Sequence, residues 1–150
     1  MARYHRLQIW HRAMRVLEEV SQDIPTLRGE ADLRDQIKRA ARSTVANICE
    51  GEAGEAVGFR RPWAGAGPAR TFGPVSAEAS AGAGSETRSD KEFRRYLVIA
   101  RASNAEVQSW YEMAQVAGLL DPERVAAVVA EIEYCGRSLS RFIAALATGP

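Results

Sequence analysis

Few residues in this chain have side chains and spacing that could do chemistry. His5 and His11 are the only two histidines, and because they are six residues apart they fall on different sides of a helix. Cys49 and Cys135 belong to no Cys-x-x-Cys pair and no Cys/His cluster. We therefore expect no metal site, and we interpret the cysteines as buried, reduced thiols.

Other signs of catalysis are equally weak. Glu50, Glu106 and Asp121 are better explained as capping or network carboxylates than as an acid/base pair. The stretch "GAGPAR" (65–70) resembles a phosphate loop, but it lacks the Lys-Ser/Thr ending and follows no strand. We expect no enzyme, no cofactor and no small-molecule substrate.

The stretch "RAARSTVANICEG" (39–51) carries a polar stripe beside an apolar one. At about 100° per residue, its polar members fall within roughly 80° of one another. These members are Arg39, Ser43, Asn47 and Glu50, and Gln36, just before the stretch, falls on the same side of the helix. The stripe is either an ordinary solvated face or a network that holds helices or subunits together. We favour the network, with Glu106 or a second subunit as the partner of Arg39.

Basic residues form two further groups on the predicted helices. The first group is a ridge on the second helix, and the second group lies near the start of the third helix. The ridge on the second helix consists of Arg34, Lys38 and Arg42. The group on the third helix consists of Lys91, Arg94, Arg95 and Arg101. Such groups can neutralise nucleic-acid phosphates, although solvated helix surface is the simpler explanation. The segment "RRPW" (60–63) could add an arginine/aromatic contact to RNA, but a solvated linker is again simpler.

Apolar periodicity predicts the elements that position these residues: one all-α domain over residues 1–150, an antiparallel up-down four-helix bundle. The expected helices span about 5–24, 31–50, 89–118 and 122–147. On the first helix the expected core stripe is Leu7, Trp10, Ala13, Met14, Leu17, Val20 and Ile24. On the second it is Leu33, Ile37, Ala40, Ala41, Thr44, Val45 and Ile48. Between the second and third helices, residues 52–88 are rich in Gly, Ala and Pro, and we interpret them as a flexible insert.

Helix ends have their own signals. Gly51 would stop the second helix, and Ser89 with Glu92 forms a capping-box pattern that would start the third. Gly118 would end that helix, and Asp121 would cap the fourth. Asn104 lies within the core arc of the third helix and needs a hydrogen-bond partner if it is buried.

Composition is that of an ordinary globular protein, with 26% charged residues, 46% hydrophobic residues and a net charge of +1. The near-zero charge argues against a general field for nucleic acid, so any basic patch must be local. The charged N-terminus and the lack of an apolar span predict a cytoplasmic protein that makes no membrane contact.

The helical segments resemble a bacterial family of four-helix-bundle proteins, named for products of intervening sequences in 23S ribosomal RNA genes. The resemblance covers about 5–51 and 89–146, and its main pattern is Q-x-x-R-A-A-x-S-x-x-x-N-I-x-E-G followed by S-D-K-E-F. Further matching positions include Leu7, Trp10, Ala13, Leu97, Ala100, Ser103 and Glu106. The long insert departs from the family pattern, as does Asn104, where an apolar residue is usual.

The resemblance implies a homo-oligomeric ring, reported as a pentamer. Accessory variability proteins of diversity-generating retroelements are similar, and they partner a reverse transcriptase and its RNA. We therefore expect a non-enzymatic scaffold that binds RNA, DNA or a reverse transcriptase through its basic helix faces. The polar stripe, with Ser103 and Glu106, would hold helices or subunits together. The alternative is a purely structural self-associating or protein-binding module with no nucleic-acid role.

Overall fold

The computed structural model describes residues 7–52 and 85–148, and the backbone alone for residues 85–90 and 148. Its helices are α1 (Gln8–Asp23), α2 (Ala31–Glu52), α3 (Ser85–Val116) and α4 (Pro122–Thr148). A short 3-10 turn, η2 (Ile24–Thr26), follows α1. The described residues contain four α-helices and no strand, so the predicted all-α class is confirmed. Most of the predicted insert, residues 53–84, lies outside the described residues.

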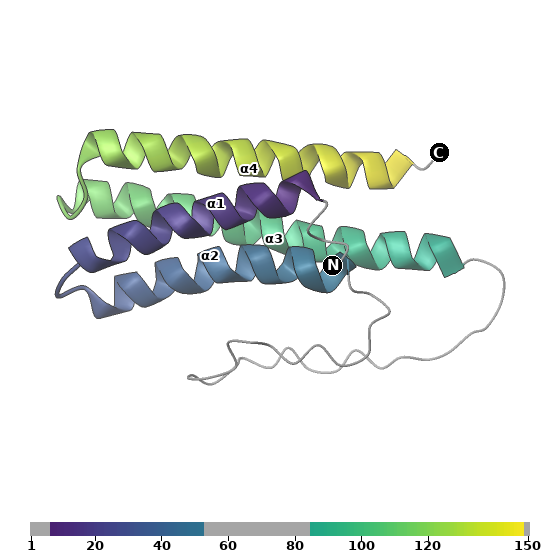
Figure 1. The fold of residues 1–150 in the computed structure, drawn as a ribbon, viewed down its shortest axis with the longest axis horizontal. Helices are drawn as coiled ribbons and strands as arrows, with labels where there is room; N and C mark the ends of the chain where they lie inside the picture. The colour runs from purple at the N-terminus through teal and green to yellow at the C-terminus, as the bar shows by residue number, and fades with distance from the viewer. Residues whose placement is uncertain (1–6, 53–84, 149–150) are drawn as a thin grey trace.

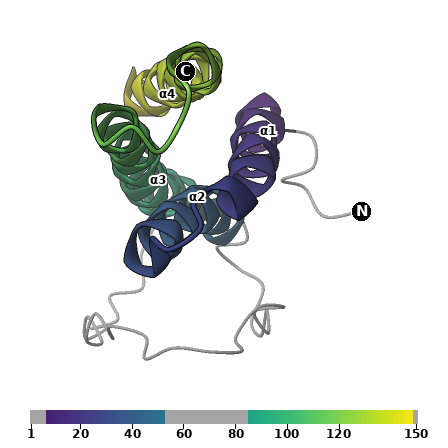
Figure 2. The ribbon, with the colours of Figure 1, turned by 90° about the vertical axis from the view of Figure 1, so that its left-hand side faces the viewer.

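The four helices lie side by side along a common direction (Figure 1). Helix α1 packs against α2 and α4, and α3 also packs against α2 and α4. The end-on view shows the helices arranged around a common axis (Figure 2). The short connections from α1 to α2 and from α3 to α4 lie at the same end of the bundle. Because each amphipathic helix has two neighbours, its apolar stripe can be buried on both flanks.

The core follows the predicted stripes closely on α2 and less closely on α1. On α2 every predicted core residue is buried except Leu33, which is half-buried. On α1 the buried side is rotated, because Ile9 and Val16 are buried whereas Trp10 is only half-buried. The predicted core stripe of α1 is therefore wrong in its orientation. Its centre lies on the flank of the helix, and the buried side is the one that faces the bundle axis.

Two predicted helix ends are wrong. Helix α3 begins at Ser85, so Ser89 lies inside the helix and is not its N-cap. Helix α2 continues through Gly51 to Glu52, so this glycine does not stop the helix. A Cβ at Gly51 would lie 2.6 Å from Phe93 Cδ2 and 2.8 Å from Tyr96 Cβ. The glycine is therefore explained by the close approach of α3, not by a helix end.

The other two ends are confirmed. Gly118 has φ +71° just after α3, and its N–H donates to the Gln115 carbonyl while the Leu119 N–H donates to the Ala114 carbonyl. This pair of bonds is the Schellman arrangement that favours glycine. At the start of α4, Asp121 Oδ1 accepts hydrogen bonds from the backbone N–H groups of Glu123 and Arg124, at 2.9 and 3.2 Å. No helix among the described residues is long and apolar enough to cross a membrane.

Candidate functional site

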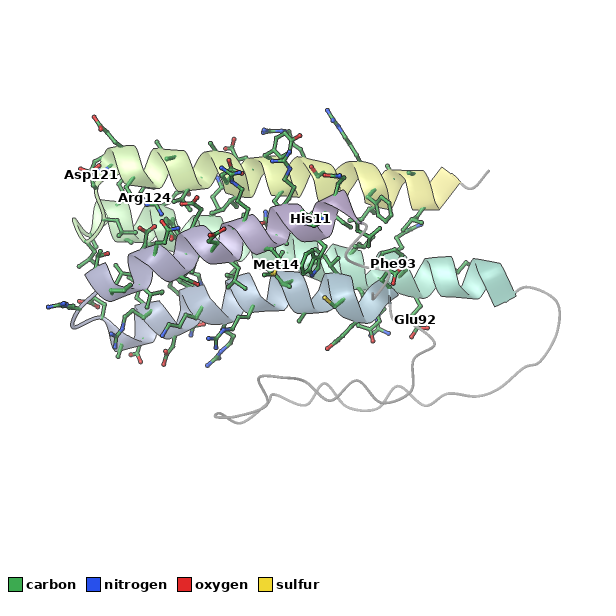
Figure 3. All side chains as sticks on the ribbon, in the orientation of Figure 1. His11, Met14, Glu92, Phe93, Asp121 and Arg124 are labelled. Carbon is green, nitrogen blue, oxygen red and sulfur yellow. The ribbon has the colours of Figure 1, made fainter. Side chains whose placement is uncertain are left out.

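A buried ionic cluster lies at the end of the bundle that carries the two short connections, where Figure 3 labels Arg124. Asp23, in the last turn of α1, is only 7% exposed. Its carboxylate accepts a hydrogen bond from Tyr111 Oη at 2.9 Å, and from Arg124 Nε at 2.8 Å to Oδ1 and 3.1 Å to Oδ2. Arg124 Nη2 also contacts Glu19 Oε2 at 2.9 Å and the Glu19 carbonyl at 3.3 Å. The cluster thus joins α1, α3 and α4.

The electrostatics of this cluster explain its composition. Asp23 lies at the negative end of the α1 dipole and Arg124 at the positive end of the α4 dipole, so each charge is unfavourable on its own helix. Placed together, the two charges offset both penalties. The hydrogen bond to Asp23 raises the pKa of Arg124, and burial, followed by the charge of Asp23, raises the pKa of Tyr111. Because the Asp23 oxygens already accept from Tyr111 and Arg124, the cluster suits holding helices together rather than proton transfer.

Sequence reasoning missed this cluster. Asp23 and Arg124 are 101 residues apart, so no helical wheel brings them together. A usable signal was present, because an acidic residue ends the first helix and a basic residue begins the fourth. Acidic residues are usually favoured at helix N-termini and basic residues at helix C-termini, so both positions are unfavourable on their own helices. A charge in an unfavourable position indicates an oppositely charged partner on another element.

The predicted polar stripe of α2 lies partly in the seam between α2 and α3. Ser43 Oγ and Ser103 Oγ share a hydrogen bond of 2.9 Å, which links the two helices. Asn47 Nδ2 donates to the Ser43 carbonyl at 2.7 Å and to Ser43 Oγ at 3.1 Å. The structure thus brings together three of the predicted network residues, Ser43, Asn47 and Ser103.

The remaining members of the predicted network are placed differently. Arg39 is exposed, and within the described part of the chain no ion pair joins it to Glu106. Glu106 Oε1 instead accepts a hydrogen bond from Trp110 Nε1 at 3.3 Å on the same helix. Gln36 and Glu50 are half-buried. The described residues thus show no Arg39–Glu106 pair within the chain, and a partner for Arg39 on a second subunit stays a prediction.

The predicted basic groups differ in exposure. On α3, all four residues are exposed: Lys91, Arg94, Arg95 and Arg101. On α2, Arg42 is exposed, whereas Arg34 and Lys38 are half-buried. The Nε of Arg34 is shielded from solvent and has no hydrogen-bond partner among the described atoms. The α3 group is thus better placed to meet a large anionic partner than the α2 ridge.

Asn104 is buried, and it has the hydrogen-bond partner that the sequence required. Its Nδ2 donates to the Ile132 carbonyl on α4 at 2.8 Å. A Cβ at Gly136 would lie 3.3 Å from this nitrogen, so the glycine leaves room for the amide. The Asn104 Oδ1 has no partner among the described residues.

Both cysteines are free thiols, and neither is activated. Burial raises the pKa of Cys135 to about 12, and burial also raises the pKa of Cys49. A raised pKa keeps a thiol protonated and poorly nucleophilic at neutral pH. In the described ranges, no group of three or more His, Cys, Asp or Glu residues is arranged to hold a metal ion.

Comparison with known families gives one match, and it falls on the half of the chain that holds α3 and α4. Residues 75–141 match the 23S rRNA-intervening sequence protein family. The resemblance inferred from the sequence is thus confirmed over α3 and most of α4. The match does not extend to the α2 stretch 39–51, and its description names no catalytic activity. No curated protein matches the chain.

Proposed function

We propose that this chain is a non-enzymatic scaffold, an antiparallel up-down bundle that assembles into a homo-oligomeric ring and binds nucleic acid. The observation that carries the proposal concerns α3, which is the one described helix that lies wholly within the family match. This helix presents the exposed basic group near its start and exposed apolar side chains near its end. The short connections at one end of the bundle support the up-down arrangement.

Exposed apolar side chains support self-association. Met113 and Val116 are 56% and 91% exposed, and with Ser109, Glu112 and Ala117 they line an open, mostly apolar depression near the end of α3. Exposed apolar groups that lie together often mark protein interfaces. Light scattering should give a mass several times that of one chain, and a monomer would remove the ring.

Substitutions on the α2 stripe test the role of each residue separately. Asn47→Ala removes two hydrogen bonds beside the α2/α3 seam and should lower the melting temperature. Arg39 is exposed, so Arg39→Ala should reduce the assembled mass and should lower the melting temperature only as far as subunit contacts are lost. If neither mass nor melting temperature changed in either variant, the stripe would be an ordinary solvated face.

Nucleic-acid binding is tested by a gel shift with structured RNA at increasing salt. Affinity should fall steeply as salt rises, because bound phosphates release counterions. Replacing Arg94 and Arg95 with Gln should weaken binding more than Arg28→Gln, a control in the connection before α2. If the chain forms a large assembly but binds no RNA at low salt, the alternative function is favoured, a purely structural self-associating module. The exposed apolar side chains of Met113 and Val116 are the observation that supports this alternative.

A further inference from the structure

A tyrosine flanked by arginines lies on the surface where α1 meets α4. Tyr134 is 44% exposed, which is high for a large aromatic side chain. The guanidinium carbon of Arg12, on α1, lies 4.0 Å from the centre of its ring. The guanidinium carbon of Arg137, one turn further along α4, lies 5.9 Å from the same centre. Arg12 immediately follows His11, which Figure 3 labels on α1.

The charges around Tyr134 leave Arg12 available for an anion. Arg15 contacts Glu131 and Arg137 contacts Glu133, each at 3.6 Å between nitrogen and oxygen. These are long, exposed ion pairs of small net stability, so a phosphate could compete for the arginines. Among the described residues, Arg12 has no carboxylate partner, and its charge is held against the ring instead. Exposed Arg141 follows Arg137 by one further turn.

We propose that this surface, the Tyr134 platform, binds single-stranded nucleic acid by stacking a base on the exposed part of the tyrosine ring, which Arg12 does not cover. The platform consists of Arg12, Tyr134 and Arg137. The aromatic ring suits a base because every base has a π face, and the guanidinium groups suit the adjoining phosphates. An acidic peptide would use the arginines but would gain little from the exposed ring. This inference rests on the proposed nucleic-acid function. It adds that the Tyr134 platform is a binding surface and that the bound nucleic acid is single-stranded.

The platform also fits the charge of the whole chain. A net charge of +1 gives no general field, and binding through phosphates alone would favour a duplex, because its charge density is higher than that of a single strand. A stacking residue adds a contact that a base-paired duplex cannot make, because its bases are already stacked. Single-stranded RNA should therefore bind more tightly than a duplex of the same sequence.

The experiment is fluorescence anisotropy of the full chain with a labelled single-stranded RNA of roughly 12 nucleotides, and with its duplex. Tyr134→Leu should weaken single-strand binding about tenfold, whereas Tyr134→Phe, which keeps the ring, should bind nearly as wild type does. Arg12→Gln should reduce the slope of log affinity against log salt by about 0.7, the value expected for one phosphate contact to a single strand. Arg28→Gln, with the same change of charge elsewhere, should leave the affinity and the slope nearly unchanged.

Several results would overturn the platform. If the wild type binds RNA but Tyr134→Leu binds equally well, the platform is wrong and the proposed function stands on the basic groups. Equal loss in Tyr134→Leu and Tyr134→Phe, with unchanged melting curves, would also refute stacking. Binding of an acidic peptide that is lost in Tyr134→Leu, with no RNA binding at low salt, would refute both the platform and the nucleic-acid function.

Discussion

The buried cluster at Asp23 predicts an unusual result, in which a second substitution restores stability that the first one removed. Asp23→Ala deletes the acceptor of the Tyr111 hydroxyl and of Arg124 Nε. The Tyr111 side chain is fully buried, and a buried hydroxyl without a partner costs about 1–3 kcal/mol, so we take about 2. The Arg124 side chain is 31% exposed, and water can replace part of its lost contact, so we take about 1 kcal/mol.

The free energy of unfolding should therefore fall by about 3 kcal/mol in Asp23→Ala, which corresponds to roughly 10 °C in melting temperature. Tyr111→Phe alone should cost about 1–2 kcal/mol, because it removes a hydrogen bond to a charged group. Adding Tyr111→Phe to Asp23→Ala removes the orphaned hydroxyl and should restore about 1–2 kcal/mol. Urea denaturation at neutral pH, followed by far-UV circular dichroism, measures all three variants.

The double variant decides the interpretation. If it is less stable than Asp23→Ala by the full cost of Tyr111→Phe, the two residues act independently and the reasoning is refuted. Arg124→Met offers a further check from the third member of the cluster. It should cost about 2–3 kcal/mol alone and much less when Asp23 is also replaced by Ala, since breaking a buried pair harms more than removing both charges.

Three further predictions concern single positions. Gly51→Ala should destabilise by about 1–3 kcal/mol, because the added Cβ would overlap Phe93 and Tyr96; a melting curve equal to wild type would contradict the close approach of α3. Gly118→Ala should cost about 1 kcal/mol because φ is +71°, measured by the urea midpoint. For Cys135, the pKa is raised from 9.0 to about 12, so its contribution to stability is complete below about pH 9 and declines by about 1.4 kcal/mol per unit above it. Cys135→Ala should therefore lose less stability between about pH 9 and 11 than wild type does, and an equal loss would refute this.

The helices could be predicted from the sequence because local periodicity and end signals determine them. All seven expected core positions of α2 lie on its inner side, and the Asp121 cap and the Gly118 turn are where local chemistry places them. The errors have a different origin. Ser89 matched a capping pattern, yet the helix begins earlier, because a local motif cannot exclude a longer helix. Gly51 looked like a stop, although its reason is a neighbouring helix that local sequence does not reveal.

The contacts between helices could be predicted only in part. From the sequence, Ser43 and Asn47 were expected on the polar stripe of α2, with Ser103 and Glu106 as candidate partners, but nothing in the sequence favoured Ser103 over Glu106. Choosing requires the rotation and height of α3 beside α2, and those depend on packing across the whole core. Predicting the Asp23 cluster would require the relative rotation and height of three helices, α1, α3 and α4.

The buried polar residues of α3 explain how one packing of four similar apolar stripes is selected. Ser103 bonds to α2, Asn104 to the α4 backbone, and Tyr111 to Asp23 on α1. Apolar stripes repeat along each helix, so a shift of α3 by one turn, about 5.4 Å, would still bury apolar surface. The same shift would separate all three polar contacts, at a cost of about 1–3 kcal/mol for each group left buried without a partner. We infer that α3 sets the register of the other helices, as isolated buried polar residues do in coiled coils.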